Sequence, residues 1–352
     1  MIGKTEPKPA KKELMESLQK VVVTLNEKER SGFELAFQFG HGQNFDDLKP
    51  FNRVIIIVTI NAVKQVLMDG IIAYHQLIPG NGSGSSIFTV FGEDVSLMMD
   101  LVEKTVSHKG QDDPTIAKEI ISKYSSYGMI AEVKSPEGIS QPGANDSVSR
   151  QQATDLEHLK IMAHRYGFVF YITAGPEAKD NIAYWGPPKS EGTRQKALST
   201  NIGPHSNVET INFSYDSLAA TLVKGNIDDA KTNQIKPVET SSSKIKKISK
   251  KSALESQSKV RLKLLLQKSG NDLKTAMALA QGITDASLQK VATAEGTLST
   301  IRYGDLLMPH RLVGIRGAGQ EFDGDWRVSK VTHTIERGEY KQSFTLSKEG
   351  TG

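Results

Sequence analysis

Two blocks of strands with alternating apolar and polar residues, one at each end of the chain, constrain the fold more than any other feature. At the C-terminal end, residues 326–335 and 340–346 alternate closely, and Arg337, Gly338 and Glu339 form a short turn sequence between them. Such alternation is typical of strands with one buried face and one exposed face. The stretch from 302 to 346 is therefore predicted to be a β-meander that forms one wall of a larger structure.

The N-terminal block extends from about residue 18 to residue 91. Apolar residues alternate with polar or small residues at 33–39, which predicts a half-exposed strand, whereas residues 53–60 are apolar on both faces and predict a buried strand. Two longer strands are predicted at 65–77 and 86–91, with a hairpin tip at the glycine-rich residues 80–84. A closed or nearly closed barrel would hide the edges of so many strands.

Helical periodicity separates the two blocks. Helices are predicted at 94–102, 112–124, 154–166 and 272–290. Asp112 or Asp113 can cap the second helix, and Thr154 with Glu157 has the spacing of a capping box for the third. Strands are expected at 168–173 and 182–185, and the strand pattern returns over 208–223.

Composition excludes several classes of protein. Hydrophobic residues make up 38% of the 352 residues and charged residues 24%, which suits a soluble protein of two to four domains with substantial cores. A net charge of +4 is too small to indicate a nucleic-acid surface. Cysteine is absent, so disulfides, thiolate zinc sites and cysteine nucleophiles are excluded.

Targeting signals are also absent from the sequence. The N-terminus is polar and has no apolar segment of a secretory signal, so the chain is expected to be made in the cytoplasm. The longest apolar run, at 54–60, is far below the roughly 20 residues that a membrane-spanning helix needs. No membrane span is predicted.

None of the possible sites for chemistry is persuasive. Gly314, Gly317 and Gly319 resemble a dinucleotide loop, but a strand pattern follows them instead of a helix, so a β-turn with glycines at positive φ is the better interpretation. His158 and His164 are six residues apart on a predicted helix and should lie on different faces, which does not suit zinc. No catalytic, cofactor-binding or metal residue is assigned, and the chain is not predicted to be an enzyme.

Three further features have structural explanations. His333 lies between two threonines of a strand and is expected to be a packed or interfacial ring. Asp112 and Asp113 are better explained as helix caps than as the carboxylate pair of a glycosidase. The basic segment from Lys244 to Lys251 lacks aromatic residues, so a solvated loop or a docking strap is favoured over phosphate binding, and no specific nucleic-acid partner is predicted.

Several segments carry a family resemblance, and they are spread over residues 18–350. They include residues 32–37, 66–72, 89–101 and 154–171, together with the C-terminal pattern of Gly317, Gly319, residues 322–324 and residues 331–346. In this order they resemble the late control gene D proteins of contractile phage tails. The same hub fold forms the N-terminal part of VgrG-type spike proteins.

The resemblance implies a homotrimeric baseplate hub of a phage tail or contractile injection system. Each chain would be mainly β with α+β insertions and would supply two tube-like β-barrels, so that three chains imitate a sixfold ring. The implied domains are 1–108 (first barrel with a polar tail), 109–204 (α+β), 205–230 with 288–352 (second barrel), and 231–287 (inserted polar linker and helix). The two β blocks would be a degenerate duplication, although no short repeat is visible.

The implied partners are the inner tube or a tube-initiator protein, a separate trimeric spike protein and other baseplate components. The OB-fold and β-helix of a VgrG spike would come from another protein, and no lysozyme-like insertion is visible. The polar residues Lys341, Ser343 and Thr345 are candidates for a lumen wall, although alternation is compatible with either face lining it. The rival hypothesis is a baseplate-associated peptidoglycan hydrolase.

Overall fold

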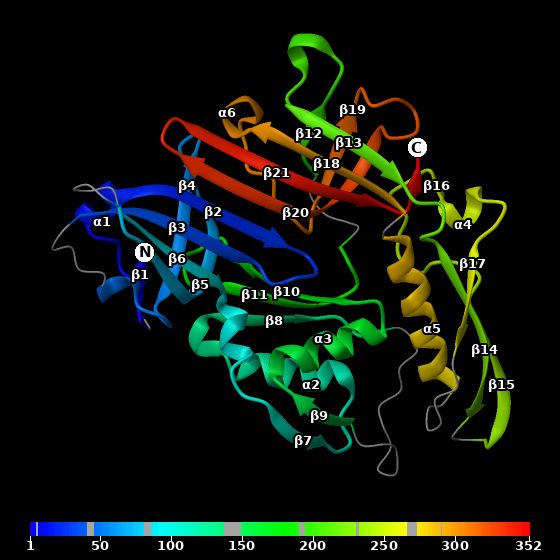
Figure 1. The fold of residues 1–352 in the computed structure, drawn as a ribbon. Coiled ribbons are helices and arrows are strands. Elements are labelled where there is room, and N and C mark those ends of the chain that lie inside the picture. Colours follow the sequence, from blue (N-terminus) through cyan, green and yellow to red (C-terminus); the bar gives the residue numbers. More distant parts are fainter. Residues whose placement is uncertain are drawn as a thin grey trace.

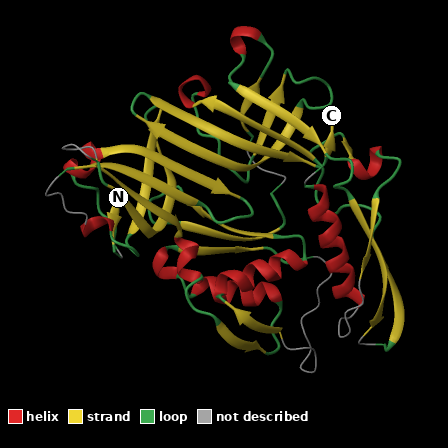
Figure 2. Ribbon diagram, in the orientation of Figure 1, coloured by secondary structure: helices red, strands yellow, loops and turns green. Residues whose placement is uncertain are grey.

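The computed structural model describes residues 1–4, 6–40, 46–80, 86–136, 149–189, 194–229, 232–265, 273–289 and 291–352. Its main element is a 12-stranded sheet, and this sheet joins the two β blocks (Figure 1). The strands run in the order β1-β4-β5-β6-β3-β2-β20-β21-β18-β13; β19 also pairs with β20, and β12 pairs with β19. Figure 2 shows these strands above a layer of helices.

The N-terminal half of the sheet contains six strands, and the C-terminal half contains six more. The first six are β1 (Ile2–Gly3), β2 (Leu18–Asn26), β3 (Gly32–Phe39), β4 (Arg53–Ile60), β5 (Val63–Ile78) and β6 (Ser86–Asp94). The others are β12 (Gln195–Ser199), β13 (Thr210–Tyr215), β18 (Ala292–Ser299), β19 (Leu312–Arg316), β20 (Gly324–Glu336) and β21 (Glu339–Lys348). Nearly all strands predicted from alternation are therefore present, and Gly338 forms the predicted β20–β21 turn with φ of 83°.

The two halves share one topology. Strands β2, β3, β4, β5 and β6 are arranged as β4-β5-β6-β3-β2, and strands β13, β18, β19, β20 and β21 are arranged as β19-β20-β21-β18-β13. Every pair within the two sets is antiparallel. The duplication suspected from the sequence is therefore present in the strand order.

The two predicted β blocks are present, but the prediction that each closes into a barrel was wrong: no strand pairing among the described residues closes a barrel. Instead, the two halves are hydrogen-bonded to each other through β2 and the second part of β20, with Thr24 opposite Thr332. The first part of β20 pairs with β19, and a β-bulge between Val328 and Lys330 bends the strand. One long bent strand can thus serve both halves, which leaves a continuous open sheet.

Each half wraps around its own core. The N-terminal core is built on residues such as Val23, Phe37 and Leu67, and the C-terminal core on Tyr303, Trp326 and Phe344. Short helices α1 (Lys12–Ser17) and α6 (Thr300–Tyr303) and the 3₁₀ turns η1 (Asp46–Leu48) and η4 (Gly203–His205) lie in the connections of these halves. The residues at 81–85, most of the predicted hairpin tip at 80–84, lie outside the described residues.

An α+β unit packs beneath the N-terminal half. It contains β7 (Lys104–His108), α2 (Asp113–Ser122), η3 (Ser125–Tyr127), β8 (Met129–Val133), β9 (Ser149–Ala153), α3 (Asp155–Arg165), β10 (Val169–Ala174) and β11 (Asn181–Gly186). Asp112 and Thr154 cap the two helices as predicted, accepting the backbone N–H groups of Thr115 and Glu157. The nearby strand β12 lies within residues 109–204 yet pairs with β19 of the large sheet.

Two local expectations need correction. The helix predicted at 94–102 is only a 3₁₀ turn, η2 (Val95–Met99), which Asp94 caps at Ser96; Val102, predicted to lie on its apolar face, is exposed and does not extend it. The segment 231–287, predicted as a linker and helix, also contains strands. With β14 (Thr221–Asp229), strands β15 (Gln234–Glu239) and β17 (Arg261–Leu265) form a three-stranded sheet against the predicted helix, α5 (Leu273–Leu288).

The C-terminus is also fixed by pairing. Strand β22 (Gly350–Thr351) pairs with β16 (Lys251–Ser252), which precedes α4 (Ala253–Ser256). No helix in the described part of the chain is both long enough and apolar enough to cross a membrane.

Candidate functional site

A polar face crosses the joint between the two halves of the sheet. The strand registers align five hydroxyl side chains in one row across β13, β18, β21, β20 and β2: Thr210, Thr297, Ser343, Thr332 and Thr24. The Thr210 and Thr297 hydroxyls lie 2.8 Å apart, and those of Thr24 and Thr332 lie 3.1 Å apart. Strands from both ends of the chain therefore build one hydroxyl row.

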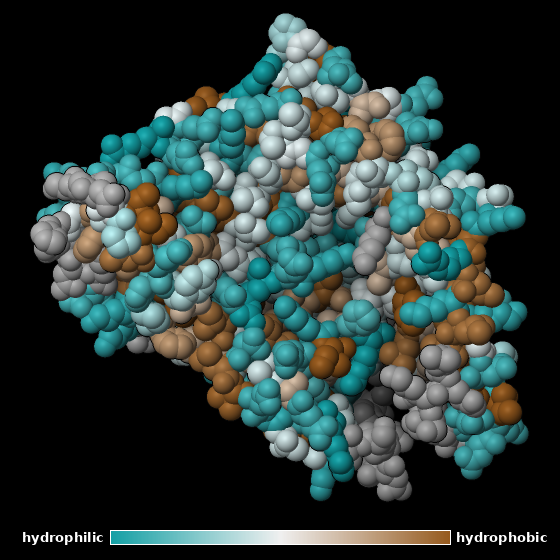
Figure 3. All heavy atoms as spheres, viewed as in Figure 1, coloured by the Kyte–Doolittle hydropathy of each residue, from teal (hydrophilic) through white to brown (hydrophobic). Residues whose placement is uncertain are grey.

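A second row runs beside the hydroxyl row on the same face. It contains Asn212, Glu295, Thr345, Lys330 and Asn26. A hollow of about 390 Å³ lies between the two rows, lined among others by Glu295, Lys330 and Thr332. Figure 3 shows mostly teal and pale side chains over this part of the molecule. The surface is wide, shallow and polar, which suits contact with water or a large partner better than enclosure of a small ligand.

The predicted residues Lys341, Ser343 and Thr345 all lie on this polar sheet face. Between them, Gln342, Phe344 and Leu346 are buried. An ion pair of 2.9 Å with Glu339 raises the pKa of Lys341 above its ordinary value, and Lys20 is raised in the same way by Glu336 at 3.0 Å. Both lysines therefore keep their positive charge at the rim of the face.

The histidines singled out in the sequence are packing residues. His333 is fully buried, and its Nδ1 lies 3.1 Å from the Tyr340 hydroxyl, so it is a packed ring as predicted. Burial lowers its pKa to about 3, which keeps the ring neutral. His158 is buried and His164 is exposed, which confirms that they lie on different faces of α3. Among the described residues, no three metal-ligating side chains come together.

Sequence reasoning missed the partner of His158. Its ring lies 5.7 Å from that of His108, at an interplanar angle of 12°. Desolvation, with His108 as a further cause, lowers the pKa of His158 to about 4. Since 50 residues separate the two rings and His108 lies outside the predicted helix, no spacing rule could have paired them.

The glycines at 314–319 form a turn and no nucleotide loop. Gly317 and Gly319 have φ values of 88° and 91°, as expected for a β-turn. A side chain at Gly317 would place its Cβ 1.9 Å from the carbonyl oxygen of Thr200, so this position requires glycine. The strand β20 follows, and the geometry of a dinucleotide site is absent from this turn.

The basic segment 244–251 is fastened to the C-terminal strand region. Glu349 accepts hydrogen bonds from the backbone N–H groups of Ile248 and Ser249 at 2.6 and 2.7 Å, and from the Ser249 hydroxyl at 2.8 Å. Lys247 forms an ion pair with Glu255 at 2.9 Å. The segment therefore behaves as a strap over the end of the C-terminal half.

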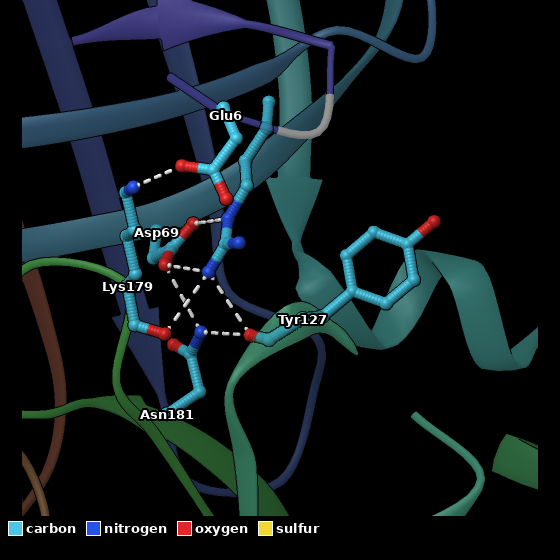
Figure 4. A network of polar contacts seen from close by, with 6 residues as sticks. Glu6, Asp69, Tyr127, Lys179 and Asn181 are labelled. Atoms are coloured by element: carbon cyan, nitrogen blue, oxygen red, sulfur yellow. Dashed lines mark hydrogen bonds and ion pairs between the residues drawn. The ribbon is translucent and has the colours of Figure 1, made fainter. Parts of the chain in front are cut away.

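A buried charge network joins the sheet to the α+β unit (Figure 4). Arg53 of β4 donates from Nε and Nη2 to Asp69 of β5 at 2.8 and 2.6 Å. Its Nη2 also donates to the carbonyl oxygens of Tyr127 and Lys179, and Asn181 Nδ2 donates to Asp69 at 3.0 Å. These hydrogen bonds hold β4 and β5 against the α+β unit, so the network is a structural contact between the two units.

A second buried cluster lies where the C-terminal half meets the same unit. Glu27 Oε2 lies 3.8 Å from Arg327 Nε, and its other oxygen lies 4.0 Å from His310 Nδ1. Burial raises the pKa of Glu27 and lowers that of His310 well below its ordinary value. The His310 ring stacks on Tyr171 with 3.4 Å between centroids, so this cluster also acts as a structural contact.

Comparison with known proteins identifies the fold. No protein-family model and no curated protein matches the sequence. Among solved structures, a tail protein from Neisseria meningitidis MC58 is similar, with a TM-score of 0.67 and 13% identity over 94% of this chain and 92% of that one. The 43 kDa tail protein of prophage MuSo2 from Shewanella oneidensis gives 0.65 and 14%, over 94% of both chains.

A component of the type VI secretion system from E. coli is similar as well, with a TM-score of 0.62 and 12% identity over 94% of this chain and 73% of that one. The resemblance noted in the sequence is thereby confirmed at the level of the fold. This chain has the fold shared by these phage tail proteins and the type VI secretion component.

Proposed function

We propose that this chain is the structural baseplate hub of a contractile injection system or phage tail, and that it adapts a hexameric inner tube to a trimeric spike. The observation that most supports this proposal is the duplicated topology, because each chain offers two four-stranded walls, β5-β6-β3-β2 and β20-β21-β18-β13. Three chains would then present six similar walls. A sixfold tube could dock on one end while a threefold spike docks on the other.

The polar sheet face is the proposed lining of the central channel. It crosses the C-terminal wall and continues over the joint onto β2, and its hydroxyl row carries no apolar side chain from Thr210 to Thr24. A hydrated, polar wall would let cargo or a tail-tube component pass without adhering, whereas an apolar wall would bind it. Lys341, Ser343 and Thr345 would be lumen residues in this arrangement.

The proposed partners are the inner tube or a tube-initiator protein, a separate trimeric spike protein and other baseplate components. Assembly would take place in the cytoplasm, as part of a phage-tail-like particle. The role is not enzymatic, since it requires strand edges, rims and a smooth wall and no reacting groups.

The proposal is tested by the mass of the purified chain and by its co-purification with tube and spike proteins encoded beside it. A trimeric mass with retention of both partners is expected. A chain that stays monomeric and binds neither partner would contradict the proposal. The rival activity, peptidoglycan hydrolysis, would require wall cleavage on a zymogram that is lost when a carboxylate is substituted.

A further inference from the structure

Strand β17 is the most open strand of the small sheet beside α5. The strands of this sheet run in the order β15-β14-β17, so β15 and β17 are its two edges, and Figure 1 shows it projecting from the large sheet. Helix α5 packs on β14 and β15. Of β17, Leu265 reaches the core under α5, whereas the other four residues of the strand are exposed.

The two faces of β17 differ in chemistry. Val223 of β14 packs under α5, and the parallel register places Lys263 opposite it. Paired residues share a face of a sheet, so Arg261 and Lys263 lie on the side that faces α5. Leu262 and Leu264 lie on the opposite side, where they are 56% and 69% exposed. One side of β17 is therefore basic, and the other is apolar and open to water.

The cations of β17 lack partners, in contrast to a lysine on the other edge of the same sheet. Lys236 of β15 forms an ion pair with Asp229 at 2.9 Å. Within the described ranges, no residue forms an ion pair or hydrogen bond with the side chains of Arg261 and Lys263. The surrounding segment 244–263 contains eight basic residues and one acidic residue. An anionic partner would therefore meet uncompensated positive charge.

The backbone edge of β17 is also available. On the opposite edge, β15 contains Pro237, which has no N–H group to donate to a further strand. The sequence of β17, Arg-Leu-Lys-Leu-Leu, contains neither proline nor glycine. Its second edge has no strand partner among the residues that the structure describes. Such an edge can accept an extended segment through main-chain hydrogen bonds.

We propose that β17 binds an extended segment of a partner protein in which acidic and apolar residues alternate, and that this segment adds a fourth strand to the small sheet. Its acidic side chains would lie beside Arg261 and Lys263. Its apolar side chains would lie beside Leu262 and Leu264 and remove their surface from water. The inference goes beyond the proposed hub function and does not depend on it.

A second copy of the chain does not fit this edge. If two β17 strands paired with their leucines on one face, their basic residues would share the other face. Like charges directly opposite each other on paired strands are destabilising. The charges that oppose self-pairing are the ones that attract an acidic strand, so the edge discriminates between these two partners.

The probe for the test is a short synthetic peptide in which valine and glutamate alternate. It carries a fluorophore and is titrated with the purified full chain. We expect saturable binding by fluorescence anisotropy that weakens as the salt concentration rises, because charge pairs contribute to it. A peptide in which valine and lysine alternate should not bind. A chain that does not bind the valine-glutamate peptide would overturn the proposal.

Charge reversal on β17 identifies the residues responsible. The double variant Arg261→Glu with Lys263→Glu should bind the valine-glutamate peptide at least about tenfold more weakly and should gain binding to the valine-lysine peptide. That gain also shows that β17 is still folded. The matched control, Lys250→Glu with Lys251→Glu, makes the same change of charge at exposed positions of the strap and should bind like the wild type. An equal loss in the control would indicate general attraction to the basic segment and overturn the edge site.

Hydrogen exchange measured by mass spectrometry locates the added strand. Backbone amides of residues 261–265 should exchange more slowly when the valine-glutamate peptide is bound, because a new strand protects them. Protection confined to other segments overturns strand addition at β17. A single-stranded oligonucleotide that binds as tightly as the peptide and displaces it would assign the surface to nucleic acid and overturn the proposal.

Discussion

The two halves of the sheet have the same strand order but fill their cores in opposite ways. In the N-terminal half, Phe33 lies over two glycines, and a Cβ added at Gly92 or Gly70 would come within 2.2 or 2.9 Å of its ring. The counterparts of these three residues in the C-terminal half are Ala294, Leu346 and Trp326. The large side chain thus comes from a different strand in each half.

A second layer shows the same exchange. Leu35 faces Val90 in the N-terminal half, whereas Gly296 faces Phe344 at the equivalent positions. In both layers the larger residue moves between strands. The comparison teaches that this duplication preserves topology and leaves the individual side chains free to change. No repeat could therefore be visible in the sequence.

The largest expected effect comes from removing the large residue of the C-terminal layer. Trp326 is fully buried and its indole N–H donates to the Phe322 carbonyl at 2.8 Å. We expect Trp326→Ala to lower the free energy of unfolding by about 3–5 kcal/mol through the cavity that it leaves. Urea denaturation followed by circular dichroism measures the change, with Ile301→Ala as an exposed control. A loss below about 1 kcal/mol would show that Trp326 does not fill this layer.

Placing a large residue beside Phe33 in the N-terminal half tests the comparison directly. Gly92→Leu introduces the residue found at the equivalent position of the other half, and we expect it to cost about 1–3 kcal/mol by overpacking against Phe33. The double variant Phe33→Ala with Gly92→Leu should lose less free energy of unfolding than the two single variants lose together. Additive losses would mean that the two positions do not share one volume.

The pairing of β2 with β20 buries His333, and this should make the free energy of unfolding depend on pH. Its folded pKa of about 3 lies below the value of about 6.5 in an unfolded chain, so the unfolded state binds a proton first as pH falls. The neutral ring contributes full stability above pH 6.5, and this contribution declines by about 1.4 kcal/mol per pH unit towards pH 3.

Denaturation of the wild type and of His333→Gln between pH 7 and pH 5 measures this contribution as the difference between the two slopes. Comparing slopes removes the shared titration of carboxylates and of the other buried histidines. Equal slopes in the two proteins would contradict a neutral, buried His333.

The smallest effect concerns the hydroxyl row. Thr24→Val removes one side of the 3.1 Å contact to Thr332 across the joint, and we expect a loss of about 0.5–1 kcal/mol. Thr297→Val lies beside the edge strand β13. It should lower the free energy of unfolding less, because its partner Thr210 is exposed and can bond to water. A larger loss at Thr297 than at Thr24 would contradict this ranking.

Much of the fold followed from the sequence because its signals are local. Period-2 alternation located the strands of both halves, Asp112 and Thr154 marked the helix starts, and Gly338 marked the β20–β21 turn. The polar face was predicted in part, since Lys341, Ser343 and Thr345 alternate with buried residues of the same strand. The fold of the whole chain was also anticipated by its resemblance to phage tail proteins.

Only the tertiary structure decided which strands are neighbours. Alternation assigns a residue to a face but carries no information on the partner strand, and Thr24 meets Thr332 across 308 residues of chain. For the same reason the sequence could not reveal that one bent strand, β20, joins the halves into an open sheet, or that Arg53 and Asp69 tie that sheet to the α+β unit. Those contacts depend on packing between distant segments, where geometry and volume select the partner.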